Sequence, residues 1–225
     1  MLPAAAAELS SPIGPAAEPA PPWQVKGLPQ QTKPLTRFSV VAEDGVRVLR
    51  VESDHGYGNL VHPLSGARAG TLAWRWRVDQ VPTGADLQRK SGDDAALKVC
   101  ALFDLPAAQV PFVERQLLRI ASARAGEALP TATLCYVWDP LLANGALLHN
   151  AFTHRVRYII VRRTLGQWSD ERHDLAADFR RAFRDDAGDA REVPALTGIG
   201  ISADSDNTAS RSVGYLGDLQ LIEPR

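Results

Sequence analysis

The sequence has little of what identifies a redox or structural zinc protein. Only two of its 225 residues are cysteines, Cys100 and Cys135, so a zinc site built from four cysteines of this chain is excluded. They do not form a Cys-x-x-Cys pair, which excludes that redox motif. One disulfide is compatible with the sequence but not required by it, because buried free thiols are common. Both states of the two thiols stay open.

Long apolar runs and an excess of one charge are also missing. No apolar stretch approaches the ~18 residues that a membrane-spanning helix needs. The chain holds 25 Lys and Arg against 26 Asp and Glu, a net charge of −1, and these charges are mixed along it. Without a basic run or face, nucleic acid is not an expected partner.

No complete catalytic motif is present either. The five histidines form no His-Glu-x-x-His pattern. The segment Gly200–Asp204 has aspartate where the second glycine of a nucleophile elbow belongs, and Gly56-Tyr-Gly58 lacks the third glycine of a dinucleotide site. The motifs therefore favour a binding protein over an enzyme.

Composition divides the chain into two parts. Residues 1–22 are rich in Ala and Pro, which predicts a disordered leader, and residues 23–225 are predicted to form one domain. The Ala-rich start is typical of the stub left by a cleaved signal peptide, which predicts a periplasmic or secreted protein. The alternative is a cytoplasmic protein with a disordered tail.

Alternation of polar and apolar residues predicts mostly β-strands. A hairpin is expected around Asp44-Gly45, and helices are expected over 112–126 and just after Asp174, a suitable N-cap. The expected strands are 36–41, 46–51, 71–78, 95–103, 132–138, 156–161, 196–202 and 212–222. Because strands and helices do not alternate regularly, we predict an all-β fold with two short helices, an antiparallel β-sandwich of jelly-roll type.

Four motifs carry a resemblance to a known family. They are Trp74–Asp79, Ala85–Ala96, Tyr136–Trp138 and Ala203–Thr208. Together they resemble a bacterial family of exported proteins catalogued as domain of unknown function 3047, from about residue 36 to residue 221. The resemblance implies an exported protein and no particular activity.

The end of the chain carries a second, architectural resemblance. The segment Gly214–Leu221 is similar to the last strand of galactose-binding-like jelly rolls, a fold of many carbohydrate-binding modules. This resemblance implies that Asp218 helps to hold a structural calcium ion. It is a resemblance of fold, and a fold does not determine a function.

The segment Ala203–Thr208 is a candidate metal site. In an extended segment, Asp204 and Asp206 lie on one face, and their oxygens suit a hard cation such as calcium. The predicted ligands of a structural calcium are Asp204, Asp206, Asn207 and Asp218. The alternative is that the segment forms Asx turns that cap a strand end.

The loop before residue 95 is a candidate ligand site. Lys90, Asp93 and Asp94 lie close in sequence, and the two carboxylates can converge on a cation or a sugar hydroxyl. Arg157 is added to this set as a possible partner of the acids. The alternative is an Arg–Asp lattice that only holds loops in place.

Two tryptophans complete the candidate ligand site. Trp76 and Trp138 occupy strand positions from which an aromatic ring can stack on a sugar. The alternative is that they belong to the core, where a tryptophan buries a large area.

Three functions fit these observations. The one we favour is an exported module that binds a carbohydrate or another cell-envelope component, with a structural calcium as an option. The first alternative is a hydrolase or lyase that acts on polysaccharide through the loop carboxylates. The second is a structural envelope protein without catalytic activity.

Overall fold

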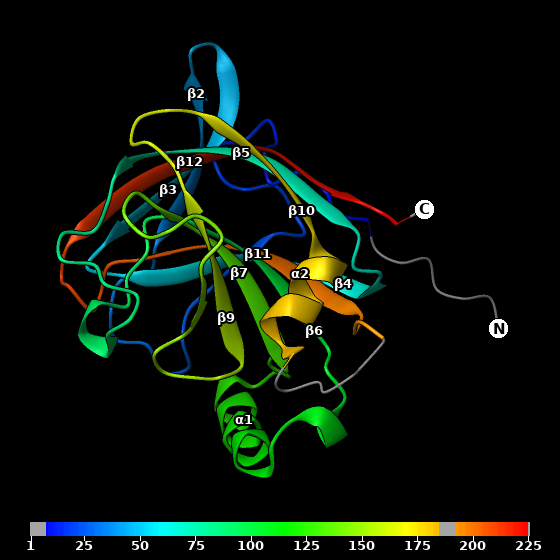
Figure 1. The fold of residues 1–225 in the computed structure, drawn as a ribbon. Helices are drawn as coiled ribbons and strands as arrows, with labels where there is room; N and C mark the ends of the chain where they lie inside the picture. Colours follow the sequence, from blue (N-terminus) through cyan, green and yellow to red (C-terminus); the bar gives the residue numbers. More distant parts are fainter. Residues whose placement is uncertain (1–7, 185–191, 225) are drawn as a thin grey trace.

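The computed structural model describes residues 8–184 and 192–224, which form two β-sheets packed face to face (Figure 1). Every paired strand is antiparallel to its neighbour among these residues, except that β7 and β9 run parallel. The all-β sandwich with two short helices that the sequence predicts is confirmed.

The larger sheet has seven strands within the described part of the chain. In spatial order they are β1 (Gln24–Lys26), β4 (Tyr57–Ala67), β11 (Leu196–Asp204), β6 (Lys98–Phe103), β7 (Ala132–Asp139), β9 (Val156–Arg162) and β8 (Leu147–His149). The late strand β11 therefore lies between two strands from the first half of the chain.

The smaller sheet has five strands in the same described ranges. In spatial order they are β10 (Ser169–Asp174), β5 (Thr71–Gln80), β12 (Arg211–Ile222), β3 (Val46–Asp54) and β2 (Arg37–Glu43). The predicted hairpin joins β2 and β3, with Glu43 paired to Val46.

Within residues 8–184 and 192–224, two α-helices connect strands of the sandwich. Helix α1 (Phe112–Ala125) lies between β6 and β7 in sequence and ends at Gly126, whose φ of 71° is the left-handed conformation that glycine adopts most easily. Helix α2 (Leu175–Ala182) begins after Asp174, whose carboxylate accepts hydrogen bonds from the N–H groups of Ala176 and Ala177. The short 3-10 helices are η1 (Lys90–Gly92) and η2 (Ala107–Gln109).

The core between the sheets is aromatic at its centre. The indole rings of Trp74 and Trp76 on β5 meet edge to face with centroids 5.3 Å apart, and Trp74 also contacts Tyr136 on β7. Trp76 is completely buried, and Trp138 is 2% exposed. Each ring removes a large apolar area from water, so this layer stabilises the contact between the two sheets.

Cys100 and Cys135 form a disulfide. They are directly paired on the neighbouring strands β6 and β7, and both are buried in a small apolar cluster on the outer side of the larger sheet. This settles the alternative that the sequence leaves open.

Residues 8–22 lie against the sandwich, although their composition predicts disorder. The indole N–H of Trp23 donates to the carbonyl of Ser10 at 2.9 Å. The guanidinium of Arg47 on β3 donates to the carbonyl of Gly14 at 2.7 Å. Leu9 and Ile13 pack against the main core.

A polar network lies at the edge of this core, and it explains why the polar segment Ser169–Asp174 forms strand β10. Glu171 accepts hydrogen bonds from the indole N–H of Trp76 at 3.0 Å and from Arg163 at 2.7 and 2.6 Å. His173 lies within 3.7 Å of Glu171 and within 3.5 Å of Asp178. Buried polar groups need such partners, and the carboxylate of Glu171 has three of them.

This network should make stability depend on pH. Burial opposes the shift, but Asp178 and Glu171 raise the pKa of His173 above its ordinary 6.5. The stability gained from this pairing is complete below that value and is lost as the pH rises through the higher folded pKa. Burial would raise the pKa of Glu171 and of Asp178, but their hydrogen-bond partners lower both values. The contribution of these two carboxylates to stability is therefore lost only as the pH falls below ~4.

We therefore expect the stability difference between the protein and His173→Gln to be largest near pH 6 and to shrink toward pH 9. Urea unfolding at several pH values measures it. The matched control is His55→Gln, because His55 is exposed beside Asp54. A difference for His173→Gln that stays constant from pH 6 to 9 would contradict the assignment.

Candidate functional site

The two acidic segments singled out in the sequence meet at one end of the larger sheet. Asp94 accepts hydrogen bonds from the backbone N–H groups of Asn207 at 3.2 Å and Thr208 at 2.7 Å. The hydroxyl of Thr208 donates to the same carboxylate at 2.5 Å. The loop after η1 and the loop after β11 are therefore joined through one carboxylate.

Next to this junction lies a buried ion pair. The ammonium group of Lys98 on β6 lies 2.6 Å from the carboxylate of Asp204 on β11, and the N–H of Ala95 donates to the other oxygen at 2.6 Å. Burial raises the pKa of Asp204 to about 6, against the lowering effect of Lys98. Burial would lower the pKa of Lys98, but the Asp204 carboxylate raises it instead. Both groups are therefore charged at neutral pH.

Asp93 connects this region to a third loop. Its carboxylate accepts a hydrogen bond from the side-chain amide of Asn150 at 2.5 Å, and the hydroxyl of Tyr158 on β9 lies 3.4 Å away. Burial is the main cause that raises its pKa. We call Asp93, Asp94, Lys98 and Asp204 the acidic cluster.

The acidic cluster is a closed network. All four members are at most 5% exposed, and each is bonded to other parts of the chain. Lys90 lies at its outer rim, with its ammonium 5.6 Å from the ring centre of Phe152. The geometry shows how three loops are held together, and ligand binding by Lys90, Asp93 and Asp94 stays a prediction.

The four predicted calcium ligands do not lie together. Asp204 is paired with Lys98, while Asp218 lies on β12 in the other sheet. Asp206 is half-buried, and burial raises its pKa. Within residues 8–184 and 192–224, no group of three or more His, Cys, Asp or Glu side chains is arranged to hold a metal ion. Calcium binding by the remaining residues around Asn207 stays a prediction.

The other predicted ligand residues lie inside the protein. Trp76 and Trp138 belong to the core between the sheets, so a sugar cannot stack on them without unfolding. Arg157 points inward from β9 and is 2% exposed; its guanidinium lies over the ring of Phe183 and donates to the carbonyl of His154. The core alternative for the tryptophans therefore describes their position.

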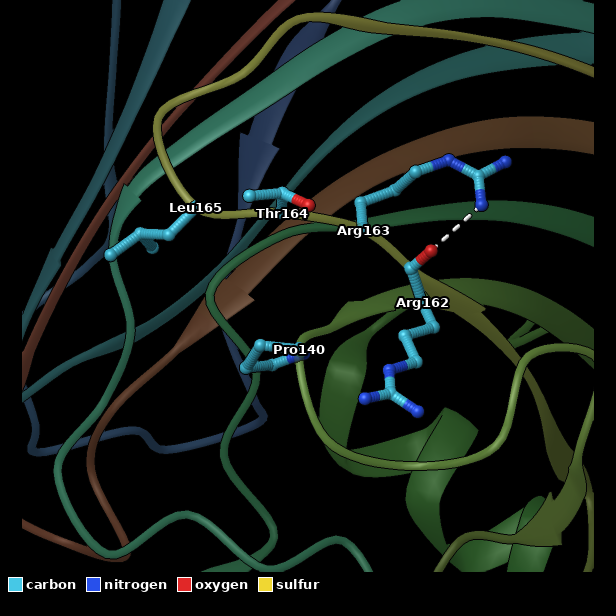
Figure 2. A pocket seen from close by; sticks show the side chains of 5 residues that line it. All are labelled: Pro140, Arg162, Arg163, Thr164 and Leu165. Carbon is cyan, nitrogen blue, oxygen red and sulfur yellow. Dashed lines mark hydrogen bonds between the residues drawn. The ribbon is translucent and has the colours of Figure 1, made fainter.

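A wide depression of about 420 Å³ lies beside the end of β9, and Figure 2 shows the side chains that line it. Its walls are Pro140, Arg162, Arg163, Thr164 and Leu165. Arg163 is engaged by Glu171 and also donates to the carbonyl of Arg162 at 2.8 Å. No aromatic residue is among the walls, so this depression offers a sugar ring no flat face to stack on.

A second groove, of about 130 Å³, lies on the outer face of the smaller sheet, and we call it the Trp168 groove. It is lined by Glu43, Asp44, Val46, Arg47, Val48, Arg75, Trp168, Gly217 and Asp218. Trp168 immediately precedes β10 and is half-buried, so part of its ring stays accessible. The groove thus combines an aromatic wall with both hydrogen-bond donors and acceptors.

Two arginines of β5 hold the indole of Trp168. The guanidinium of Arg75 lies 4.7 Å from the ring centre, and that of Arg77 lies 5.3 Å from it. Arg77 is fixed in turn by ion pairs with Glu43 at 2.9 Å and Asp79 at 2.8 Å. Cation–π contacts of this kind orient the ring before any ligand arrives.

Arg75 differs from the two neighbouring arginines, Arg47 and Arg77. Arg47 donates to backbone carbonyls of the N-terminal segment, and Arg77 is paired with carboxylates. For Arg75, no hydrogen-bond or ion-pair partner is found among the described residues, and its Nε is buried. Its guanidinium is therefore a donor held in position on Trp168.

Two further walls of the groove, Gly217 and Asp218, come from β12. A Cβ at Gly217 would lie 3.4 Å from Cγ of Arg75, so the backbone of β12 passes directly beside this arginine. The register with β5 shifts between Gly217 and Gln220, and Asp218 has a φ of 52°. Such a bulge redirects a side chain, and here it exposes the Asp218 carboxylate at the groove.

Sequence reasoning found Asp218 but missed Trp168. Asp218 was predicted as a metal ligand, and the structure places it in the Trp168 groove instead of beside Asp204. Trp168 lies in a segment without strand or helix periodicity. The available signal was a bulky aromatic next to polar residues in an expected loop.

Comparison with known proteins gives a family. The model of the family described as "Protein of unknown function (DUF3047)" matches residues 21–220. The chain belongs to this family. The DUF3047 match covers the acidic cluster and the Trp168 groove alike. No curated protein matches the chain.

Solved structures similar to this DUF3047 protein are distant. One is the xyloglucanase domain of NopAA, a type three effector from Sinorhizobium fredii, in complex with cellobiose: identity is 9%, the TM-score is 0.43, and 90% of this chain and 98% of that chain are covered. Another is the cellulose induced protein Cip1, with 13% identity, a TM-score of 0.40, and 90% and 92% of the two chains covered.

Proposed function

We propose that this protein is a carbohydrate-binding module and that the glycan binds in the Trp168 groove. A sugar ring presents an apolar C–H face and hydroxyl groups that both donate and accept hydrogen bonds. The groove offers the matching groups, since Trp168 supplies a flat ring, Arg75 supplies donors, and Asp218 supplies an acceptor.

The main support for this proposal is that the side chains of the groove are held in position before a ligand binds. The ring of Trp168 is fixed by two guanidinium groups, and Arg75 lacks a hydrogen-bond or ion-pair partner within residues 8–184 and 192–224. Groups that are already oriented lose little conformational entropy on binding, which favours affinity. The acidic cluster lacks this property because its carboxylates are occupied by partners.

An exported location, in the periplasm or outside the cell, is part of this proposal. The disulfide between Cys100 and Cys135 supports an exported location, because such bonds persist mainly in oxidising compartments. A periplasmic or secreted module would meet polysaccharide there. The structural calcium remains part of the proposal only for the residues next to Asn207.

Affinity electrophoresis tests the proposal. The probes are native gels that contain xyloglucan, a neutral β-glucan, or polygalacturonate, an acidic polysaccharide. We expect one of these glycans to retard the protein, and Trp168→Ala to weaken the retardation at least tenfold, about 1.4 kcal/mol. Asp218→Ala should weaken it less, through one lost hydrogen bond.

Phe152→Ala is the matched control. Phe152 is an aromatic residue that is 59% exposed, and it lies beside Lys90 at the acidic cluster. Retardation that is unchanged in Trp168→Ala but lost in Phe152→Ala would move the site to the acidic cluster and overturn the assignment of the groove. If neither glycan retards the protein, binding of neutral β-glucans and binding of acidic polysaccharides are both contradicted.

A further inference from the structure

Helix α1 exposes a row of large apolar side chains. Val113, Leu117 and Ile120 are spaced by four and three residues, so they lie on one face of the helix, and Phe112 lies next to them. These four side chains are between 51% and 68% exposed. Burial of apolar surface normally orders a surface helix, yet here the apolar face points away from the protein.

The contacts that hold α1 leave this face open. Glu114 is paired with Arg155, and the N–H of Leu129 donates to the hydroxyl of Ser122 at 3.1 Å. All fourteen residues of α1 are described, and none of them is buried. Figure 1 shows α1 at one end of the sandwich, apart from both sheets. The helix is thus anchored by its polar side.

The charge of α1 is positive. It carries Arg115, Arg119 and Arg124 against a single acid, Glu114, which is bound by Arg155. Arg124 follows Ile120 by four residues and continues the exposed row, and the exposed Arg119 follows Phe112 by seven residues and lies on the same side of the helix as Phe112. A row of apolar side chains with arginines along its flank and at its end is the pattern of helices that lie in a membrane surface.

The size of α1 favours a lipid surface over a protein partner. With a rise of ~1.5 Å per residue and a width of ~10 Å, its outward face covers on the order of 200 Å². A stable protein interface buries about 800 Å² per partner and has few charges at its centre. The same length, ~21 Å, is too short to cross a bilayer core of ~30 Å.

We propose that α1 binds the surface of a membrane that contains anionic phospholipid. Phe112, Val113, Leu117 and Ile120 enter the boundary between headgroups and acyl chains, while Arg119 and Arg124 contact lipid phosphates. No helix among the described residues is long and apolar enough to cross a membrane. The attachment we propose is therefore peripheral, and it is separate from the Trp168 groove on the smaller sheet.

Vesicle co-sedimentation of the full chain tests this. The vesicles contain phosphatidylglycerol with phosphatidylcholine, or phosphatidylcholine alone. We expect the protein to pellet with the anionic vesicles, and Leu117→Glu/Ile120→Glu to reduce the bound fraction at least tenfold. Arg119→Glu/Arg124→Glu should reduce binding to anionic vesicles, and added salt should do the same.

The matched control is Leu141→Glu, because Leu141 is 79% exposed and lies in a different loop. It should bind like the unchanged protein. Because the substituted α1 residues are exposed, the melting temperatures should also be unchanged. Absent binding to anionic vesicles, or equal binding by Leu117→Glu/Ile120→Glu, would overturn the proposal.

Size-exclusion chromatography with light scattering tests whether α1 instead binds a second copy of this chain. A dimer that Leu117→Glu/Ile120→Glu converts to a monomer would show that the row binds a second copy, and the membrane proposal would fail. Glycan retardation of the same variant should be unchanged, so the outcome does not depend on the carbohydrate site.

Discussion

Lys98→Met is expected to lower the free energy of unfolding by about 3–5 kcal/mol, because it leaves the Asp204 carboxylate buried without its counter-charge. Methionine fills a similar volume, so the effect is electrostatic and not a cavity. Urea unfolding at pH 7, followed by tryptophan fluorescence, measures the loss. The loops around Asp94 should loosen at the same time, because they are bonded to the same strand ends.

Two further variants define the cause. Lys90→Met removes an exposed lysine of the neighbouring loop and should change stability by less than about 0.5 kcal/mol. In Lys98→Met/Asp204→Asn the charge is removed as well, and we expect more than 1 kcal/mol of the loss to be recovered. A Lys98→Met protein as stable as the parent would contradict the buried ion pair.

Loss of the disulfide should have an effect of similar size. The bond between Cys100 and Cys135 closes a loop with a sequence separation of 35, for which the restriction of the unfolded chain corresponds to about 3–4 kcal/mol. Cys100→Ala/Cys135→Ala should therefore unfold at a clearly lower urea concentration. The two strands stay paired through their backbone, so the fold itself should be retained.

Reduction gives the control for this experiment. Dithiothreitol should lower the unfolding midpoint of the parent protein and leave that of Cys100→Ala/Cys135→Ala unchanged. Equal midpoints of the parent with and without reductant would show that the bond adds no stability. The loss of two sulfur atoms from the apolar cluster is measured by the difference between the reduced parent and the double variant.

Periodicity predicted the strands whose inward residues are apolar, and it failed where they are polar. Strand β5 alternates Leu72, Trp74 and Trp76 with polar residues, and it was predicted with nearly correct bounds. Strand β10 turns Glu171 and His173 inward, where Trp76, Arg163 and Asp178 are their partners. Such a strand has no apolar signal, because its stability comes from partners distant in sequence.

Strand β4 was missed for a related reason. Its eleven residues include two glycines and Pro63, which break the usual strand pattern. It is nevertheless fixed between β1 and β11 in the larger sheet. The fold class could be predicted because it depends on many strands, whereas the position of one irregular strand depends on neighbours that the local sequence does not contain.

The candidate sites show the same limit. The sequence predicted Asp93 and Asp94 as residues of a ligand site and Asp204 as a residue of a metal site. The structure brings these two segments together. The sequence could not show that Lys98 pairs with Asp204 or that Thr208 donates to Asp94, because these contacts join residues about a hundred positions apart. Nor could it place Trp168 beside Arg75, since that contact depends on the pairing of β10 with β5.

The order of strands also determines when the chain can fold. Strands β11 and β12, from the last thirty residues, occupy interior positions in the two sheets, between β4 and β6 and between β5 and β3. Neither sheet is continuous before these segments are synthesised, and contacts of such long sequence separation form slowly. We therefore expect both sheets to be completed only when the last thirty residues are available, so that the core between them closes late in folding.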